Sequence, residues 1–237
     1  LTGECADEIF GGYPWFHKKE CFQAKTFPWT MDLSARKVLL ADDFIQELHM
    51  DEYVQATYEK SVAETPRLAE DTPEEARRRE IAWLNLKWFM QTLLDRMDRT
   101  SMHSALEARV PFADHRIVEY VYNIPWHMKC NNGVAKSLLV SAGKNLLPKE
   151  VLFRKKSPYP KTYDPAYEAL LKSRLIDIMN SPNEPIHSII DKNKVFTFLQ
   201  TPSDYGRPWY GQLMAGPQLI AYFLQINYWM QKYGLSL

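Results

Sequence analysis

The sequence has 237 residues, and its 29 basic residues balance its 29 acidic residues, so the formal net charge at pH 7 is zero. A protein that binds nucleic acid non-specifically needs a basic excess, so this balance argues against that class. No apolar run approaches the length of a membrane span, and no N-terminal signal peptide is recognisable. Cys5, Cys21 and Cys130 are odd in number and lack metal-ligand spacing, which favours a reducing, cytoplasmic compartment.

Apolar residues recur with a helical period along nearly all of the chain, which predicts a mainly α-helical protein with few or no strands. Pro73 and Pro165 occupy positions at which helix starts tolerate proline, and Asp114 precedes an apolar face as an N-cap would. The expected helices cover about 33–48, 51–63, 73–95, 114–123, 134–147 and 164–180. Pro, Gly, Asn and Ser predict loops at 125–133, 154–163 and 200–210.

The last helix has the clearest pattern. Pro217 fits its first turn and Gly234 is a stop signal. Its apolar residues recur at i, i+3, i+4 and i+7, which predicts one continuous buried stripe made of Leu219, Tyr222, Phe223, Ile226, Trp229, Met230 and Tyr233.

The segment Thr2–Tyr13 places a small-residue turn before an apolar helical turn that ends in paired glycines. Unpaired backbone N–H groups at a helix start suit a phosphate. Glu4 and Asp7 are three residues apart, so on a helical turn they would share one face. Two carboxylates beside a phosphate suggest a Mg²⁺ ion between them. On spacing alone, an N-cap with acidic first-turn residues is the simpler explanation.

The exact sequence of this segment is more informative than the spacing of its two carboxylates. Thr2–Tyr13 closely resembles the SGEGSDEIFGGY-type segment of the class II, glutamine-hydrolysing asparagine synthetases. Thr2 stands for the Ser of that family, and Cys5 and Ala6 stand for its Gly-Ser or Gly-Ala.

A second motif combines Asp98–Met102 with Glu107–Asp114. Glu107 and Arg109 place opposite charges around a turn that looks buried, so a structural ion pair followed by a helix cap would explain it. The functional interpretation is a wall of an active site that orders a charged substrate. The string resembles the DRMSMxxSLExRxPFLD segment of the family almost throughout, and it departs at Ala113, where the family usually has Leu.

A third motif is the proline-stiffened basic loop that begins at Arg154 and contains Lys156. Such a loop is usually solvated, but beside the α-phosphate of ATP a lysine would neutralise the charge that develops in adenylation. The family has a similar RKK-type loop, and its catalytic lysine corresponds to Lys156. The turn Asn131–Lys136 matches the NGxxK turn of the family and lacks the glycine spacing of a P-loop.

The resemblance covers residues 1–16, 93–161 and, more loosely, 205–235. It implies that 1–237 is the C-terminal helical part of an α/β adenine-nucleotide pyrophosphatase-type (PP-loop) synthetase domain, with a variable helical insertion at 25–75. In the family, ATP adenylates aspartate to β-aspartyl-AMP, and ammonia from glutamine then attacks this intermediate.

The resemblance also implies residue roles. Thr2 and Gly3 would contact ATP, Glu4 would support formation of the acyl-adenylate, and Asp7 would hold Mg²⁺ together with Glu4. Lys156 would stabilise the charge that builds up in the transition state. The implied partners are aspartate, ATP and the glutaminase domain of the parent chain.

Two parts of the family pattern are not found in this sequence: the SGGxDS pyrophosphatase loop and the nucleophilic N-terminal Cys of the glutaminase domain. We therefore expect a piece of a longer protein that is inactive alone. We also expect an exposed apolar edge near Trp15, Trp83 and Trp88, which would favour self-association as a homo-oligomer.

Two other functions fit the same residues. A β-lactam synthetase-like cyclase would share the fold and would use an additional Tyr/Glu pair as its base, for which Tyr13 is available. A non-catalytic helical interaction module would use the three charged motifs only as helix caps and solvated loops.

Overall fold

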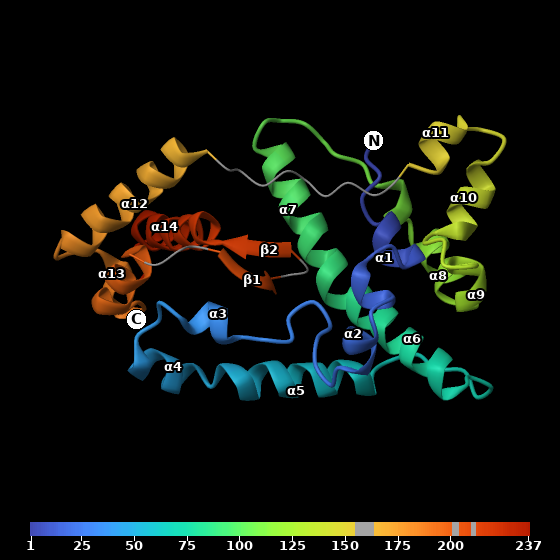
Figure 1. The fold of residues 1–237 in the computed structure, drawn as a ribbon, viewed down its shortest axis with the longest axis horizontal. Helices are drawn as coiled ribbons and strands as arrows, with labels where there is room; N and C mark the ends of the chain where they lie inside the picture. The colour runs from blue at the N-terminus through green and yellow to red at the C-terminus, as the bar shows by residue number, and fades with distance from the viewer. Residues whose placement is uncertain (155–163, 201–203, 210–211) are drawn as a thin grey trace. The chain divides into compact units, whose positions relative to one another are not determined.

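The computed structural model describes residues 1–154, 164–200, 204–209 and 212–237 (Figure 1). The described residues are mainly α-helical, which confirms the expected fold class. None of the helices in these ranges is long and apolar enough to cross a membrane.

The strands β1 (Asp204–Trp209) and β2 (Gln212–Ala215) form an antiparallel hairpin. Strand β1 lies within the loop predicted at 200–210, so that prediction was wrong for residues 204–209. Gly and Pro suggested the loop, but a register irregularity between Asp204 and Pro208 lets the hairpin accommodate both residue types.

The chain divides into two compact units, and each has its own core. The first unit comprises Leu1–Pro28 and Gln55–Ser157, and the second comprises Trp29–Val54 and Pro158–Leu237. The expected insertion at 25–75 therefore contributes to both units. That these residues are a variable insertion stays a prediction.

The first unit is built from short helices around one long helical rod. Its elements are α1 (Ala6–Phe10), η1 (Pro14–Phe16), α2 (Lys19–Gln23), most of α5 (Met50–Ala63), α6 (Pro73–Leu84), η2 (Asn85–Met90), α7 (Gln91–Met102), η3 (Pro111–Ala113), α8 (His115–Tyr122), α9 (Trp126–Lys129), α10 (Ser137–Gly143) and α11 (Lys149–Leu152). One-turn helix α9 lies inside the predicted loop 125–133.

The rod α6–η2–α7 corresponds to the helix predicted at 73–95 but continues to Met102. It starts as expected, with Pro73 in the first turn and the Thr72 hydroxyl accepting a hydrogen bond from the Glu75 N–H (3.2 Å). Its middle is a π-helical turn, η2. There the fully buried Asn85 side chain donates to the carbonyl of Glu8 in α1 (3.1 Å). The π-turn thus anchors α1 to the rod, which helical periodicity alone could not show.

The second unit contains α3 (Ser34–Lys37), α4 (Asp42–Leu48), α12 (Pro165–Asn180), η4 (Pro185–Ser188), α13 (Lys192–Gln200), α14 (Gly216–Tyr233) and the hairpin. The single helix predicted at 33–48 is broken. Leu40 pairs with Ile190 in a β-bridge, and the Ala41 N–H donates to the carbonyl of Ile189 (2.9 Å). These long-range backbone hydrogen bonds hold Ala41 extended and separate α3 from α4.

Helix α14 carries only part of the predicted stripe into the core. Leu219, Phe223 and Met230 are buried, whereas Tyr222, Trp229 and Tyr233 are exposed, so the stripe was wrong at these three positions. The buried face turns toward α12 and includes Asn227, whose amide oxygen accepts from the Ile186 N–H (3.2 Å). Gly234 has a φ of 61° just beyond the helix and ends it as predicted.

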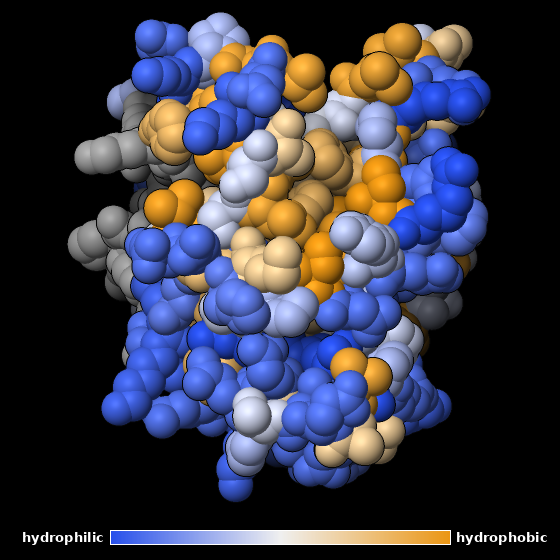
Figure 2. Space-filling view, turned by 90° about the vertical axis from the view of Figure 1, so that its right-hand side faces the viewer, coloured by the Kyte–Doolittle hydropathy of each residue, from blue (hydrophilic) through white to orange (hydrophobic). Residues whose placement is uncertain are grey.

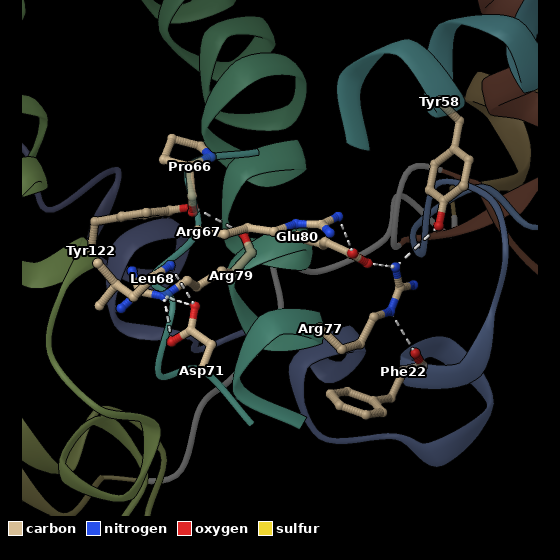
Figure 3. A network of polar contacts seen from close by, with 10 residues as sticks. All are labelled: Phe22, Tyr58, Pro66, Arg67, Leu68, Asp71, Arg77, Arg79, Glu80 and Tyr122. Atoms are coloured by element: carbon tan, nitrogen blue, oxygen red, sulfur yellow. Dashed lines mark hydrogen bonds and ion pairs between the residues drawn. The ribbon is translucent and has the colours of Figure 1, made fainter. Parts of the chain in front are cut away.

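Polar contacts around Arg77 tie α6 to the C-terminal end of α2 and to α5 (Figure 3). Its guanidinium donates to the carbonyls of Phe22 (2.8 Å) and Ala24 (2.6 Å), to the Tyr58 hydroxyl (3.0 Å) and to the Glu80 carboxylate (2.9 Å). The side chain is only 15% exposed. The Arg77 guanidinium therefore donates hydrogen bonds to four acceptors that are largely shielded from water.

We expect Arg77→Met to destabilise the first unit by about 2–4 kcal/mol, because the acceptors would lose a charged donor while the apolar stem is kept. Urea unfolding measures this. Arg99→Met is the matched control, since Arg99 is 76% exposed and pairs only with Asp95 one turn away, and it should cost at most about 0.5 kcal/mol. Equal effects of the two substitutions would contradict the assignment.

Apolar side chains gather on the upper part of the face shown in Figure 2, which is the right-hand side of Figure 1. The exposed apolar residues of α11 and its flanking turns are Leu146, Leu147, Val151 and Phe153. Of the three tryptophans expected near an exposed apolar edge, Trp15 is buried at 2% exposed, Trp83 is half-buried and Trp88 is exposed at 36%, so the expectation was wrong at Trp15. Self-association stays a prediction.

Candidate active site

The turn before α1 differs from the helical arrangement that the spacing predicted. Cys5 adopts a left-handed conformation (φ 71°) and α1 begins only at Ala6. Glu4 therefore precedes the helix, while Asp7 lies in its first turn. The expectation that Glu4 and Asp7 share one helical face was wrong, because the left-handed Cys5 between them keeps Glu4 out of the helix.

The paired glycines after α1 each leave room for a specific side chain. A Cβ on Gly12 would overlap the carboxylate oxygen Oδ1 of Asp7. Gly11 has a φ of 71°, and a Cβ there would lie 2.5 Å from the ring of Trp126. Gly12 thus allows the Asp7 carboxylate to fold over the end of α1, and Gly11 allows α9 to pack against the same turn.

Each of the two motif carboxylates is held by a cation from a distant part of the first unit. Arg96 of α7 donates to Glu4 Oε1 (2.8 Å), and Lys136 lies 2.8 Å from Asp7 Oδ1. The second oxygen of Glu4, Oε2, is buried and has no hydrogen-bond partner among the described residues. A buried carboxylate oxygen without a donor is an available ligand position.

The second motif lies against the first. The Thr2 N–H donates to the carbonyl of Arg109 (3.0 Å), and the Thr2 hydroxyl accepts from the Glu4 N–H (3.2 Å). Gly3 is exposed, and a Cβ there would meet no described atom within 4 Å. The expected nucleotide contacts, Thr2 and Gly3, therefore lie next to Glu4 on an open turn.

The ion pair of the second motif exists, but its surroundings were predicted wrongly. Arg109 donates to Glu107 (3.1 Å), and both side chains are more than 60% exposed. Asp114 caps α8 as predicted, accepting from the Arg116 N–H (2.9 Å). Hydrogen bonds from the side chain and backbone of Arg116 hold the pKa of Asp114 well below its usual range.

Lys156 lies outside the described residues, so its expected place beside the acidic pair stays a prediction. Arg154, at the start of the same loop, is exposed.

The prediction missed two functional candidates, Arg96 and Lys136. Lys136 ends the turn Asn131–Lys136 that was matched to the family, so its motif was a signal to which no role was attached. Arg96 lies one helical turn before Arg99 on α7. Its link to Glu4, 92 positions away in sequence, leaves no local signal.

Tyr13 has a carboxylate partner that the sequence did not reveal. Its hydroxyl donates to Glu8 Oε1 (2.6 Å), and Glu8 is 2% exposed. Burial, followed by the adjacent Glu8 carboxylate, raises the pKa of Tyr13 well above its usual range. The ring also stacks on Trp15 at 4.3 Å. These contacts describe a structural anchor of α1.

The residues fit a magnesium ion in part. Glu4 and Asp7 offer hard oxygen ligands, and the unpartnered Oε2 of Glu4 is the observation that favours a cation there. Within the described ranges, no group of three or more His, Cys, Asp or Glu is arranged to hold a metal. A Mg²⁺ ion commonly takes one or two carboxylates and completes its shell with phosphate oxygens and water.

Comparison of the sequence with known proteins shows which family this chain belongs to. The family model described as asparagine synthase matches residues 1–231. The chain is 47% identical over 238 aligned residues to asparagine synthetase [glutamine-hydrolyzing] 3 of Bacillus subtilis, an alignment that covers 100% of the chain and 38% of that relative. It is 37% identical over 73 residues to asparagine synthetase [glutamine-hydrolyzing] 1 of Bacillus subtilis, and 43% identical over 67 residues to the Homo sapiens enzyme, covering 31% and 27% of the chain and 12% of each relative.

The chain thus spans well under half the length of the curated relatives that it matches. The match to the family model, which includes all three sequence motifs, shows that this chain belongs to the asparagine synthase family.

Proposed function

We propose that this chain is part of an ATP-dependent ligase that converts aspartate to asparagine through a β-aspartyl-AMP intermediate, with ammonia derived from glutamine. The observation that carries the proposal is the Glu4–Asp7 pair. Each carboxylate is fixed by a cation from a distant part of the first unit, and Glu4 keeps one buried oxygen without a described hydrogen-bond partner.

The proposed roles follow from position. The open turn at Thr2 and Gly3 would contact ATP, and Asp7 and Glu4 would hold Mg²⁺. When bound, Mg²⁺ would supply positive charge that neutralises the polyphosphate. Glu4 would support formation of the acyl-adenylate, and Lys156 would stabilise charge that develops during adenylation.

Lys136 would act through Asp7. Because its ammonium group lies 2.8 Å from Asp7 Oδ1, it lowers the electrostatic cost of bringing a polyphosphate beside that carboxylate. Lys136 is thus proposed as a positioning residue, which keeps Asp7 oriented over Gly12.

The remaining parts of the proposal concern the whole protein. Ammonia would come from a glutaminase domain of the parent chain, and the exposed apolar residues around α11 support self-association.

The test is exchange of radiolabelled pyrophosphate into ATP by the full-length protein with Mg²⁺ and without glutamine or ammonia. Exchange reports reversible adenylation, so we expect it to require aspartate. The 237-residue chain alone is expected to show no exchange, because positioning supplies much of the rate in this chemistry.

The same assay separates the alternatives. A cyclase would show exchange with its own acyl substrate and none with aspartate. A helical interaction module would show no exchange with any amino acid. Either result from the full-length protein would contradict the proposed substrate or the proposed activity.

A further inference from the structure

Cys130 differs from the other cysteines of the chain in its surroundings. Cys5 and Cys21 are 1% and 8% exposed. Burial, followed by nearby carboxylates, raises the pKa of Cys5 to about 12, and burial also raises the pKa of Cys21. Cys130 is only partly buried. It directly follows α9, and its N–H donates to the Trp126 carbonyl (2.8 Å), so its position is fixed.

The Cys130 sulfur faces the ring of His17, with Sγ 3.9 Å from Nδ1. The other ring nitrogen, Nε2, lies 2.8 Å from the carbonyl oxygen of Gly11. A carbonyl oxygen only accepts hydrogen bonds, so Nε2 must carry a proton. In the neutral ring, Nδ1 is then unprotonated and directed at the thiol. A nucleophile, a base and a group that orients the base are therefore aligned.

A cation lies beside this pair. The Arg78 guanidinium donates to the carbonyl of Phe16, the residue before His17, and lies 4.4 Å from the ring centre of Trp126. It thus places a positive charge against α9, the turn that ends at Cys130. Glu74 offsets this charge only in part, because its ion pair with Arg78 is long (3.5 Å) and Glu74 is exposed. Partly exposed cysteines in such electropositive surroundings are the reactive ones in proteins.

We propose that Cys130, His17 and Arg78 form a nucleophilic thiol site that takes covalent modification by small soft electrophiles. The Cys130 thiol gives its proton to His17 Nδ1, and Arg78 stabilises the resulting thiolate. With a haloacetamide, the sulfur attacks the methylene carbon, an S–C bond forms, the carbon–halogen bond breaks and halide leaves. The proton on His17 is released to solvent. This site adjoins the end of α1, because His17 contacts the Gly11 carbonyl, and it uses neither Glu4 nor Asp7.

The test is alkylation of the native full-length protein at pH 7 by iodoacetamide, with the rate at each cysteine followed by peptide mass spectrometry. We expect Cys130 to react at least about tenfold faster than Cys5 and Cys21, and faster than N-acetylcysteine amide in the same solution. In 8 M urea the three cysteines should react alike.

His17→Gln separates the base from the structural role of His17, because the Gln amide can still donate to the Gly11 carbonyl. We expect this variant to lower the Cys130 rate about threefold or more. An unchanged rate in a folded variant would mean that Cys130 is merely exposed and would overturn the proposal. If the variant does not fold, the wild-type comparison still decides, since a Cys130 rate at or below that of N-acetylcysteine amide overturns it as well.

Discussion

Replacing Glu4 with Gln in the full-length protein is expected to slow aspartate-dependent pyrophosphate exchange by about 10²- to 10³-fold, the cost of removing one preorganised electrostatic group from an active site. The amide keeps the size of the carboxylate and can still contact Arg96. It loses the negative charge, and it can place an N–H where Oε2 now lies buried without a described partner. The change therefore removes ligand chemistry with little change in shape.

Stability should hardly change, because Arg96 is 54% exposed and its ion pair with Glu4 is worth less than about 1 kcal/mol. Glu168→Gln is the matched control. Glu168 also pairs with a cation, Lys172 at 2.7 Å, and its side chain is 31% exposed compared with 24% for Glu4. We expect this control to exchange at the wild-type rate. Full exchange by the Glu4 variant, or equal losses in both variants, would remove Glu4 from the proposed site.

The features that the sequence predicted correctly are local ones. Thr72 with Pro73, Asp114, and Gly234 each act within a few residues of a helix end, where capping and φ preference dominate. These helix ends were placed to within a few positions, whereas the far end of the helix that begins at Pro73 was placed seven residues too early. Recognition of the family also rested on contiguous strings, above all Thr2–Tyr13.

The features that were missed depend on contacts between distant segments. The break between α3 and α4 comes from backbone hydrogen bonds to residues 189–191, about 150 positions away. Within α14, Trp229 and Tyr233 have the same helical spacing as buried residues, yet their side is exposed while the polar Asn227 faces the core. Periodicity records which residues share a face but does not say which face another element covers.

In the candidate site, too, local features were predicted and long-range contacts were missed. Glu4 and Asp7 were identified from the string, but the cations that hold them were not, because Arg96 and Lys136 approach through the packing of α7 and of the turn before α10. The left-handed Cys5 was also unpredictable from its residue type, since few non-glycine residues adopt a positive φ. That strain at the turn between two motif carboxylates is typical of functional sites.

Burying the amine of Lys129 costs folding free energy, and this cost can be measured. Lys129 is 6% exposed and lines a small pocket with Ile9, Ala82 and Val118, which Glu8 also lines. Its amine donates a long hydrogen bond to the Tyr122 carbonyl (3.4 Å). Burial, and secondarily the nearby Arg79, lower the pKa of Lys129 to about 8 from its ordinary value of 10.5. The folded state therefore holds this proton less tightly than the unfolded chain.

The direction of the pH dependence follows from this difference. Between about pH 8 and 10.5 the unfolded chain binds more protons at Lys129 than the folded protein does, so this residue makes stability rise with pH in that window. Below pH 8 the lysine is charged in both states, so the folded protein bears the full free-energy cost of burying the charged amine. Cys5 acts in the opposite direction above pH 9, because its thiol stays protonated in the folded state up to about pH 12.

We therefore expect Lys129→Met to stabilise the first unit by about 2–3 kcal/mol at pH 7, since an uncharged side chain of similar length removes the desolvation cost. The advantage over wild type should shrink as pH rises from 8 to 9. Because Cys5 titrates in both proteins, the difference between their unfolding free energies isolates Lys129. Urea unfolding at pH 7, 8 and 9 measures it.

Lys144→Met provides the control, because Lys144 is exposed and its replacement should change stability by no more than about 0.5 kcal/mol at any of these pH values. A Lys129 variant that is less stable than wild type by the same amount at all three pH values would show that the amine is satisfied by the Tyr122 carbonyl and stays charged. The buried amine would then stabilise the packing of α8 against α9, and the pocket around it, whose mainly apolar lining includes Glu8, would have to be polar enough to hold the charge.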